Sequence, residues 1–384
     1  MENTADPFAI SPGTTIHKWR IVKELGRGTY GAVYKVADDE LHRDAAMKVE
    51  RRAISPEYRM LKVEVAVMIE LRAKKVKNCV QLFDHGCTPI FNYMVMSLVG
   101  HNLESLADKI AKLNNKKESK FTLYTAFYIG ISTLDTLYDL HKCLFLHRDV
   151  KPANFAIGCH AADLTTIYLL DFGTTRRYAK ENGLHHRPRA KVAFRGSTLY
   201  ASANALRERD QSRRDDIWSW LFTLISLTVG KLPWSNLKMP KKCTFIQQQE
   251  RYATAKVLCT KRPELLLKGC PPEYEEVMSY MTELLFYSRP NYEAIRSALQ
   301  KGIDRLKAGG ETPQLEWETA MRKIPKSQSS TSLYSLASTV VPPPTLAPPS
   351  APPPSAPPPP PPPPVSPKQE AKQVGVMSLW KVIK

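Results

Sequence analysis

The sequence of 384 residues lacks an uninterrupted apolar segment of membrane-spanning length. Its longest apolar stretch, residues 217–230, is broken by Ser219, Thr223, Ser226 and Thr228. A transmembrane helix needs about 20 apolar residues, so we expect a buried helix here and no membrane association. The first residues contain neither a basic region nor an apolar core, so we expect no secretory signal.

Cysteine is scarce and scattered. The seven cysteines form no Cys-x-x-Cys pair, and their number is odd. Free thiols in a reducing compartment fit this pattern better than a disulfide framework. We therefore expect a protein of the cytoplasm, the nucleus or both.

Acidic residues are outnumbered, with 37 Asp and Glu against 55 Lys and Arg and a formal net charge of +18. This balance suggests anionic partners such as nucleic acid, acidic or phosphorylated protein, or a membrane surface. The other interpretation is simple solubility, and the composition alone leaves both open. Because no recognised nucleic-acid-binding motif is present, we expect no nucleic-acid partner.

The hydrophobic pattern changes from strand-like to helical along the chain. Residues 1–15 are polar and predict a flexible N-terminal arm. Strand-like alternation over 19–50 and 79–99 flanks a helical spacing over 57–75. Further helices are predicted at 122–142, 213–230, 245–257, 273–286 and 292–307. A small β-rich part before a larger helical part predicts an α+β fold of two lobes over residues 16–310.

The C-terminal part cannot build a core. Residues 311–341 form a Ser/Thr-rich linker, 342–367 hold 17 of the 31 prolines, and 368–384 form a tail. Such a composition predicts disorder with polyproline II character. The proline segment is either a docking sequence for an SH3- or WW-type partner or an inert spacer.

Three glycines, Gly26, Gly28 and Gly31, cluster just before Val33. Glycine lets a backbone turn come close to phosphate groups with its N–H groups pointing inward. Alone, the pattern also fits a dinucleotide site or a plain hairpin turn. The residues that follow are β-patterned, where a dinucleotide-binding fold needs a helix, which argues against the dinucleotide interpretation.

Lys48 lies in a predicted strand between apolar neighbours, 17 residues after Gly31. A strand lysine is usually a surface residue, but downstream of a glycine-rich hairpin it becomes a candidate phosphate anchor. Such a cation needs a carboxylate to hold it in position. We expect Glu64 in the predicted helix to do so, with Glu70 as the competing candidate.

Two short polar clusters are bounded by apolar strands. The first spans residues 147–155 and contains Asp149, Lys151 and Asn154. The second is the Asp-Phe-Gly sequence at Asp171, 22 residues after Asp149. Coming in this order after the glycine turn and Lys48, they match the protein-kinase signature set.

On these motifs the chain resembles a eukaryotic protein kinase. It is most similar to the casein kinase I group, and within it to the tau-tubulin-kinase-like branch. The stretches specific to that group lie at 94–100, 147–155, 193–197, 200–204, 212–219 and 232–234. The resemblance implies a serine/threonine protein kinase that uses ATP and Mg²⁺. The alternative is a kinase-fold scaffold without turnover that carries a Pro-rich docking tail.

The resemblance also implies a role for each candidate residue. The residues implied to bind ATP are Gly26, Gly28, Gly31, Val33, Lys48 with its partner Glu64, the gatekeeper Met96, and the hinge residues Ser97, Leu98 and Val99. The implied catalytic residues are Asp149, Lys151 and Asn154, and the implied Mg²⁺ ligands are Asn154 and Asp171. Phosphoryl transfer depends mainly on positioning and electrostatic stabilisation, which this set supplies.

The segment after Gly173 is strongly basic, with Glu181 the one acid between Thr174 and Arg195. A basic segment beside the catalytic centre favours acidic or phosphorylated protein substrates, and the other interpretation is an Arg-rich loop that contacts solvent or its own phosphorylated residue. Leu199 stands where the casein kinase I group usually has an arginine that helps to bind phosphate, so a strict need for primed substrates is not carried over. We expect a monomer.

Overall fold

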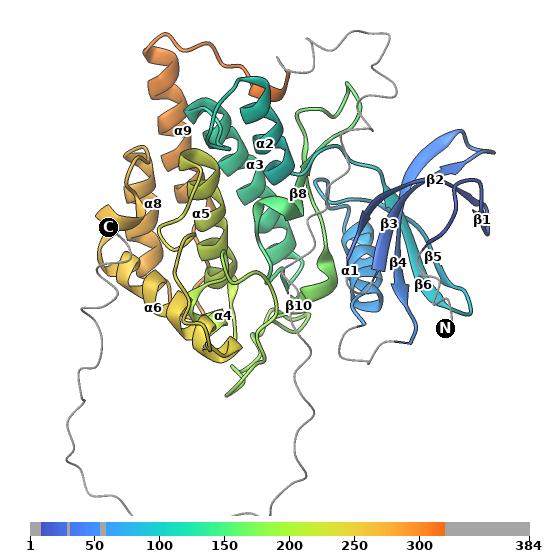
Figure 1. Cartoon of the computed structure of the whole chain (residues 1–384). Coiled ribbons are helices and arrows are strands. Elements are labelled where there is room, and N and C mark those ends of the chain that lie inside the picture. Colours follow the sequence, from blue (N-terminus) through green and yellow to red (C-terminus); the bar gives the residue numbers. More distant parts are fainter. Residues whose placement is uncertain (1–8, 29–30, 54–58, 319–384) are drawn as a thin grey trace, which may run out of the picture.

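The computed structural model describes residues 9–28, 31–53 and 59–318. They form two lobes joined after strand β6, a β-rich lobe and a larger helical lobe (Figure 1). The two-lobed α+β fold expected from the sequence is therefore confirmed. The predicted polyproline segment 342–367 and the tail 368–384 lie outside the described residues.

The smaller lobe, the N-lobe, is built on an antiparallel sheet with the order β1-β2-β3-β4-β6-β5. Alternate residues of the strands face a core that includes Trp19, Tyr34, Met47 and Val95. The strands are β1 (Thr15–Ile16), β2 (Trp19–Arg27), β3 (Gly31–Asp38), β4 (Arg43–Arg51), β5 (Leu82–Cys87) and β6 (Phe91–Ser97). The register places Val33 opposite Lys48 and Lys48 opposite Met94.

Helix α1 (Leu61–Ala73) lies beside this sheet, on the side that faces the helical lobe (Figure 1). It begins later than the predicted residue 57. Its N-terminus has no local cap, and the carboxylate of Glu50 in β4 accepts hydrogen bonds from the Met60 and Leu61 backbone N–H groups at 2.6 and 2.9 Å. Because these N–H groups have no partner within the helix, Glu50 fixes where the helix starts.

The larger lobe, the C-lobe, packs around helix α3 (Leu123–Lys142), which contacts α5 and α9. The fit is close, because a Cβ at Gly302 would meet the Phe127 ring at 2.2 Å. The other helices are α2 (Leu103–Leu113), α4 (Ala203–Leu206), α5 (Arg213–Val229), α6 (Phe245–Lys261), α7 (Pro263–Leu266), α8 (Glu273–Thr282) and α9 (Tyr292–Ala308). No helix of the described part is long and apolar enough to cross a membrane.

Short strands and single 3₁₀ turns carry the polar motifs between α3 and α4. The strands are β7 (Phe145–Leu146), β8 (Phe155–Ile157), β9 (Ile167–Leu169) and β10 (Arg176–Arg177), and the turns are η2 (Pro152–Asn154) and η3 (Phe172–Thr174). Strand β8 pairs with β9, and β10 pairs with β7. These two ribbons place the 147–155 and 171–173 motifs side by side at the face of the C-lobe that meets the N-lobe.

Two predicted boundaries differ from the structure. Ile10, assigned to the flexible arm, packs against the core of the N-lobe, and its N–H donates to the Tyr34 hydroxyl at 3.4 Å. Leu315 and Trp317, assigned to the linker after residue 310, are buried in the core of the C-lobe. Isolated apolar residues in polar surroundings carry no periodic pattern, so these long-range contacts left no local signal.

Candidate active site

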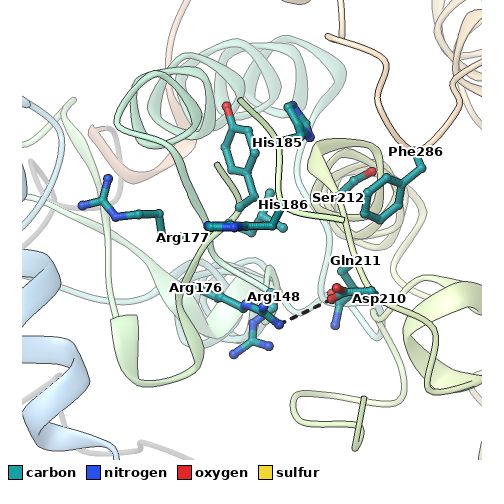
Figure 2. A pocket seen from close by; sticks show the side chains of 11 residues that line it. Arg148, Arg176, Arg177, His185, His186, Asp210, Gln211, Ser212 and Phe286 are labelled. Carbon is teal, nitrogen blue, oxygen red and sulfur yellow. Dashed lines mark ion pairs between the residues drawn. The ribbon is translucent and has the colours of Figure 1, made fainter. Parts of the chain in front are cut away.

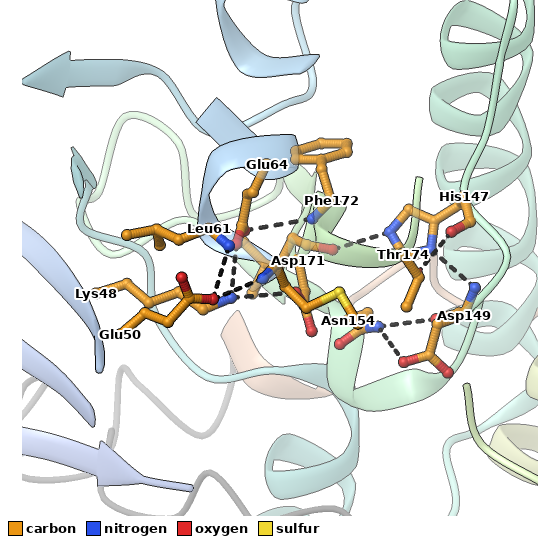
Figure 3. A network of polar contacts seen from close by, with 12 residues as sticks. Lys48, Glu50, Leu61, Glu64, His147, Asp149, Asn154, Asp171, Phe172 and Thr174 are labelled. Atoms are coloured by element: carbon orange, nitrogen blue, oxygen red, sulfur yellow. Dashed lines mark hydrogen bonds and ion pairs between the residues drawn. The ribbon is translucent and has the colours of Figure 1, made fainter. Parts of the chain in front are cut away.

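Strand β4 and helix α1 bring Lys48 and Glu64 together (Figure 3). The Lys48 Nζ lies 2.7 Å from Oε2 of Glu64 and 3.1 Å from Oδ1 of Asp171. The second Glu64 oxygen, Oε1, accepts a hydrogen bond from the Phe172 backbone N–H at 3.3 Å. Glu64 therefore links the strand lysine to the Asp-Phe-Gly segment.

The competing carboxylate, Glu70, lies one and a half turns further along α1. It forms ion pairs with Lys74, at 2.8 Å, and with Arg177. Glu64, and not Glu70, is therefore the ion-pair partner of Lys48. Glu70 links helix α1 to strand β10.

The charges of Lys48, Glu64 and Asp171 determine the protonation states of Lys48 and Asp171. Burial alone would lower the pKa of the Lys48 ammonium, but the charges of Asp171 and Glu64 outweigh burial and raise that pKa above its ordinary value. The Lys48 charge in turn holds the pKa of Asp171 well below its usual range. At neutral pH Lys48 is a cation and Asp171 an anion, as a phosphate anchor and a metal ligand require.

The glycine turn joins β2 to β3 above Lys48. The Gly28 N–H donates to the Gly31 carbonyl oxygen at 2.8 Å, which closes the hairpin. A Cβ at Gly31 would lie 2.1 Å from the Val49 carbonyl oxygen, whereas a Cβ at Gly28 would meet no atom closer than 3.9 Å. The close approach of β4 therefore requires glycine at position 31. The third glycine, Gly26, lies in β2, opposite Val33.

Apolar side chains from both lobes meet near the hinge. The cluster consists of Leu25, Ala46, Leu98 and Cys159, with Val33 and Met96 packed against it. The Ser97 N–H and hydroxyl are engaged with the backbone of Gln81, and Val99 is partly buried against the C-lobe core. Of the residues predicted to bind ATP, Val33, Met96 and Leu98 thus lie together in one apolar wall between the lobes.

The Asp149 carboxylate is held by three N–H donors. Its Oδ2 accepts from Lys151 Nζ at 2.7 Å and from Asn154 Nδ2 at 3.3 Å. Its Oδ1 accepts from the backbone N–H of Ser197 at 2.8 Å. A carboxylate fixed in one orientation is suited to accept the proton of a substrate hydroxyl.

Asp216 holds the backbone of the catalytic loop from within the C-lobe. Its two oxygens accept the backbone N–H groups of His147 and Arg148 at 2.7 and 2.8 Å, and Oδ2 also contacts His141 Nε2 at 2.9 Å. The residue is buried, with its side chain fully engaged. It acts as a structural anchor. In the same helix Trp220 is in the core, and Trp218 is only partly buried.

Asp171 and Asn154 offer oxygen atoms to a divalent cation. The Asn154 Nδ2 donates to the Asp149 carbonyl at 2.8 Å, which leaves the amide oxygen for a cation. The Asp171 side chain is 44% exposed, with Oδ1 toward Lys48. One carboxylate, one amide oxygen and ligand phosphates form a donor set that Mg²⁺ accepts. Among the described residues no group of three or more His, Cys, Asp and Glu is arranged to hold a metal.

Four basic residues of the 174–195 segment form ion pairs with carboxylates. Figure 2 shows the one between Arg176 and Asp210. The ion pairs are Arg176 and Arg189 with Asp210, Arg177 with Glu70, and Lys191 with Glu208. Arg195 differs, because its guanidinium contacts the Met60 sulfur at 3.8 Å. Burial and the charges of Arg189 and Arg195 lower the pKa of Arg148 to about 10. Carboxylates from outside the segment therefore neutralise part of its positive charge.

Several residues of the site carried no sequence signal. Glu50 looked like an ordinary strand acid two residues after Lys48, and Cys159 lay outside every motif. Ser197 orients Asp149 through its backbone N–H, which any residue type but proline would supply, so its side chain gave no indication of this contact. Glu50 is 6% exposed as a residue, and no spacing in the sequence indicated this burial.

The protein kinase domain model matches residues 19–300. A Dictyostelium discoideum protein named as a probable serine/threonine-protein kinase is 33% identical over 304 residues, which cover 78% of this chain and 56% of that protein. The serine/threonine-protein kinase spe-6 of Caenorhabditis elegans is 31% identical over 322 residues, covering 83% and 80%. A third relative, from C. elegans and with casein kinase I in its name, is 32% identical over 232 residues, covering 60% and 65%.

The matched domain takes in the glycine turn, Lys48 and both polar motifs, so the chain belongs to the protein kinase family. Its relatives carry serine/threonine-protein kinase names. The chain spans little more than half the length of the Dictyostelium protein.

Proposed function

We propose that this chain is an active serine/threonine protein kinase that transfers the γ-phosphate of ATP to hydroxyl groups of proteins. The observation that carries the proposal is that two sets of charged side chains, one for the nucleotide and one for the substrate hydroxyl, are both present between the lobes. On one side Lys48 is held by Glu64 beside Asp171, and on the other side Asp149 is fixed by three N–H donors.

Each residue has a distinct task in the proposed reaction. Lys48 holds the α- and β-phosphates, and Lys151 neutralises charge on the moving phosphoryl group. Asp149 accepts the hydroxyl proton while the hydroxyl oxygen bonds to the γ-phosphorus and the bond to the ADP oxygen breaks. Asp171 and Asn154 would hold Mg²⁺, which supplies charge neutralisation on the phosphate oxygens. The apolar wall around Met96 and Leu98 would receive the adenine.

The substrates proposed are acidic or phosphorylated proteins. Because Asp210, Glu70 and Glu208 neutralise much of the basic segment, the proposal now rests on fewer residues than the sequence indicated. Arg195 precedes the Gly196–Ser197 turn that touches Asp149, and its guanidinium contacts the Met60 sulfur and no carboxylate of the described residues. Arg187 also has no ion pair in the described part of the chain, so both arginines keep a charge that can attract an acidic substrate.

Membership of the casein kinase I group, and of its tau-tubulin-kinase-like branch, is part of this proposal. One relative with casein kinase I in its name supports it, and Leu199 in place of the usual arginine argues against a strict need for primed substrates. The proposed kinase acts as a monomer in the cytoplasm or nucleus. All seven cysteines are free thiols, which supports such a compartment. The Pro-rich segment stays a prediction of an SH3- or WW-type docking sequence.

The test is incorporation of ³³P from labelled ATP into an acidic protein mixture. Wild type should label the mixture, and Asp171→Ala and Lys48→Met should each fall to background. Asp304→Ala on the exposed face of α9 is the matched control and should label like wild type. Background labelling by folded wild type would favour the alternative, a scaffold without turnover.

A further inference from the structure

Lys256 in helix α6 is a buried amine outside the catalytic motifs. Its side chain is 1% exposed, and no carboxylate forms an ion pair with it in the described part of the chain. Lysine is almost never fully buried without a partner. Burial holds the pKa of this amine far below its ordinary value. The contacts that replace an ion pair therefore show what the side chain does.

The amine is enclosed by backbone carbonyls on one side and aromatic rings on the other. Nζ donates to the carbonyl oxygens of Thr198 at 2.7 Å and Ala201 at 2.5 Å. It also lies 5.3 Å from the ring centroid of Phe222 and 5.1 Å from that of Trp234. Carbonyl oxygens and ring faces are both electronegative, so the site is built for an N–H donor.

Trp234 completes the attachment, because its Nε1–H donates to the Leu199 carbonyl at 2.8 Å. Three of the four carbonyls in residues 198–201 are therefore bound from within the C-lobe. We call residues 196–201 the platform segment. With three carbonyls bound in this way, residues 198–201 have little freedom to shift.

The platform segment is tied to the catalytic carboxylate at its other end. The Ser197 N–H donates to Oδ1 of Asp149 at 2.8 Å. At Gly196, which has φ +123°, a Cβ would lie 3.2 Å from the same Asp149 oxygen. Immediately after the segment, the Ser202 hydroxyl donates to the buried Asp215 at 2.7 Å. The backbone beside Asp149 is thus part of one rigid piece that Lys256 supports.

We propose that Lys256 is a positioning residue that fixes the platform segment as a support for the substrate backbone beside the phosphoacceptor. Within the described residues, the hydrogen bonds and ion pairs of Lys48, Glu64 and Asp171, the residues proposed to bind the nucleotide, do not involve the platform segment or Lys256. Lys256 therefore sets the affinity for the protein substrate and leaves the affinity for ATP unchanged. The kinetic part of this inference rests on the proposed kinase function.

The test compares Lys256→Met, which keeps an unbranched apolar chain and removes the N–H donors, with Lys261→Met at an exposed position of the same helix. Hydrogen exchange of the Ser197, Tyr200 and Ala201 amides should be at least tenfold faster in Lys256→Met. The KM for a protein substrate should rise at least fivefold, and the KM for ATP should stay within twofold of wild type. Lys261→Met should match wild type in all three measurements.

Lys256→Gln keeps an N–H₂ group on a shorter chain and is used in the same way if the methionine variant does not fold. Intermediate exchange and an intermediate substrate KM are then expected. Wild-type exchange at the platform segment in a folded variant, or equal increases in both KM values, would overturn the inference. Because the exchange measurement needs no catalysis, absence of labelling by wild type would count against the kinase function alone.

Discussion

The Lys48 ammonium lies 2.7 Å from the buried Glu64 carboxylate, so one charge pair joins the sheet of the N-lobe to helix α1. Glu64 is 1% exposed, and its other oxygen holds the Phe172 N–H next to Asp171. The positions of the helix, the strand lysine and the Asp-Phe-Gly segment are therefore coupled. The nucleotide binding proposed for Lys48 and Asp171 therefore depends on the position of α1.

Replacing Glu64 by Gln should lower kcat/KM for ATP by about 10- to 100-fold. The change removes a charge-assisted hydrogen bond of roughly 1.5–3 kcal/mol, and each 1.36 kcal/mol corresponds to about tenfold in rate. Steady-state kinetics with varied ATP measures the effect. Glu70→Gln is the matched control on the same helix, and an equal loss in that variant would contradict the specific role of Glu64.

Replacing Glu50 by Ala should destabilise the N-lobe and weaken nucleotide binding. The Met60 and Leu61 N–H groups lose their acceptor, at a cost of about 1–2 kcal/mol, as for other helix N-caps. Urea unfolding and titration with an ATP analogue measure the two effects. Glu40→Ala, at an exposed position, serves as the control and should change neither quantity.

The two glycines of the turn should respond differently to alanine. In Gly31→Ala the new methyl group would meet the Val49 carbonyl oxygen at 2.1 Å, so β3 and β4 must separate. We expect a loss of about 1–3 kcal/mol in stability and at least tenfold weaker nucleotide binding. Gly28→Ala has open space and should bind the nucleotide within threefold of wild type. Equal behaviour of the two variants in the same titration would refute this explanation.

His101 should make stability depend on pH. Its side chain is buried, and burial, with the Lys109 charge, lowers its pKa to about 4. The unfolded chain binds the proton near pH 6.5, so the stabilisation is complete above that value and is lost as the pH falls toward 4. Between pH 7 and 4.5 wild type should lose about 2 kcal/mol more than His101→Gln. Urea unfolding at both pH values measures it, and parallel pH profiles would contradict the assignment.

The fold was predictable, and the candidate site could be proposed from the sequence, because each motif combines short-range spacing with a simple chemical need. The glycine turn and Lys48 lie on neighbouring strands of one sheet. The two acidic motifs lie in the other lobe and were recognised because all four motifs follow the order of the protein-kinase signature set. Ile10, Trp317 and Lys256 were not predictable in the same way. Their environments are made by residues far away in the sequence, and a single apolar or basic residue carries no periodicity that points to a distant partner.

Glu50 is an example within the site of a contact that the sequence pattern does not indicate. Its position in β4 was expected, but its contact with the start of α1 depends on how the helix lies beside the sheet. The paired state of the basic segment also emerged only from the structure, because Asp210 and Glu208 follow that segment in the chain and the fold brings them back to it.

The most direct test of the account is calorimetric titration of the folded full-length chain with a non-hydrolysable ATP analogue, with and without Mg²⁺. Saturable binding to one site is expected, at least tenfold tighter with Mg²⁺ in wild type and with no gain from Mg²⁺ in Asp171→Ala. Absence of saturable binding to folded wild type under both conditions would contradict the central claim that Lys48 and Asp171 grip a nucleotide between the lobes.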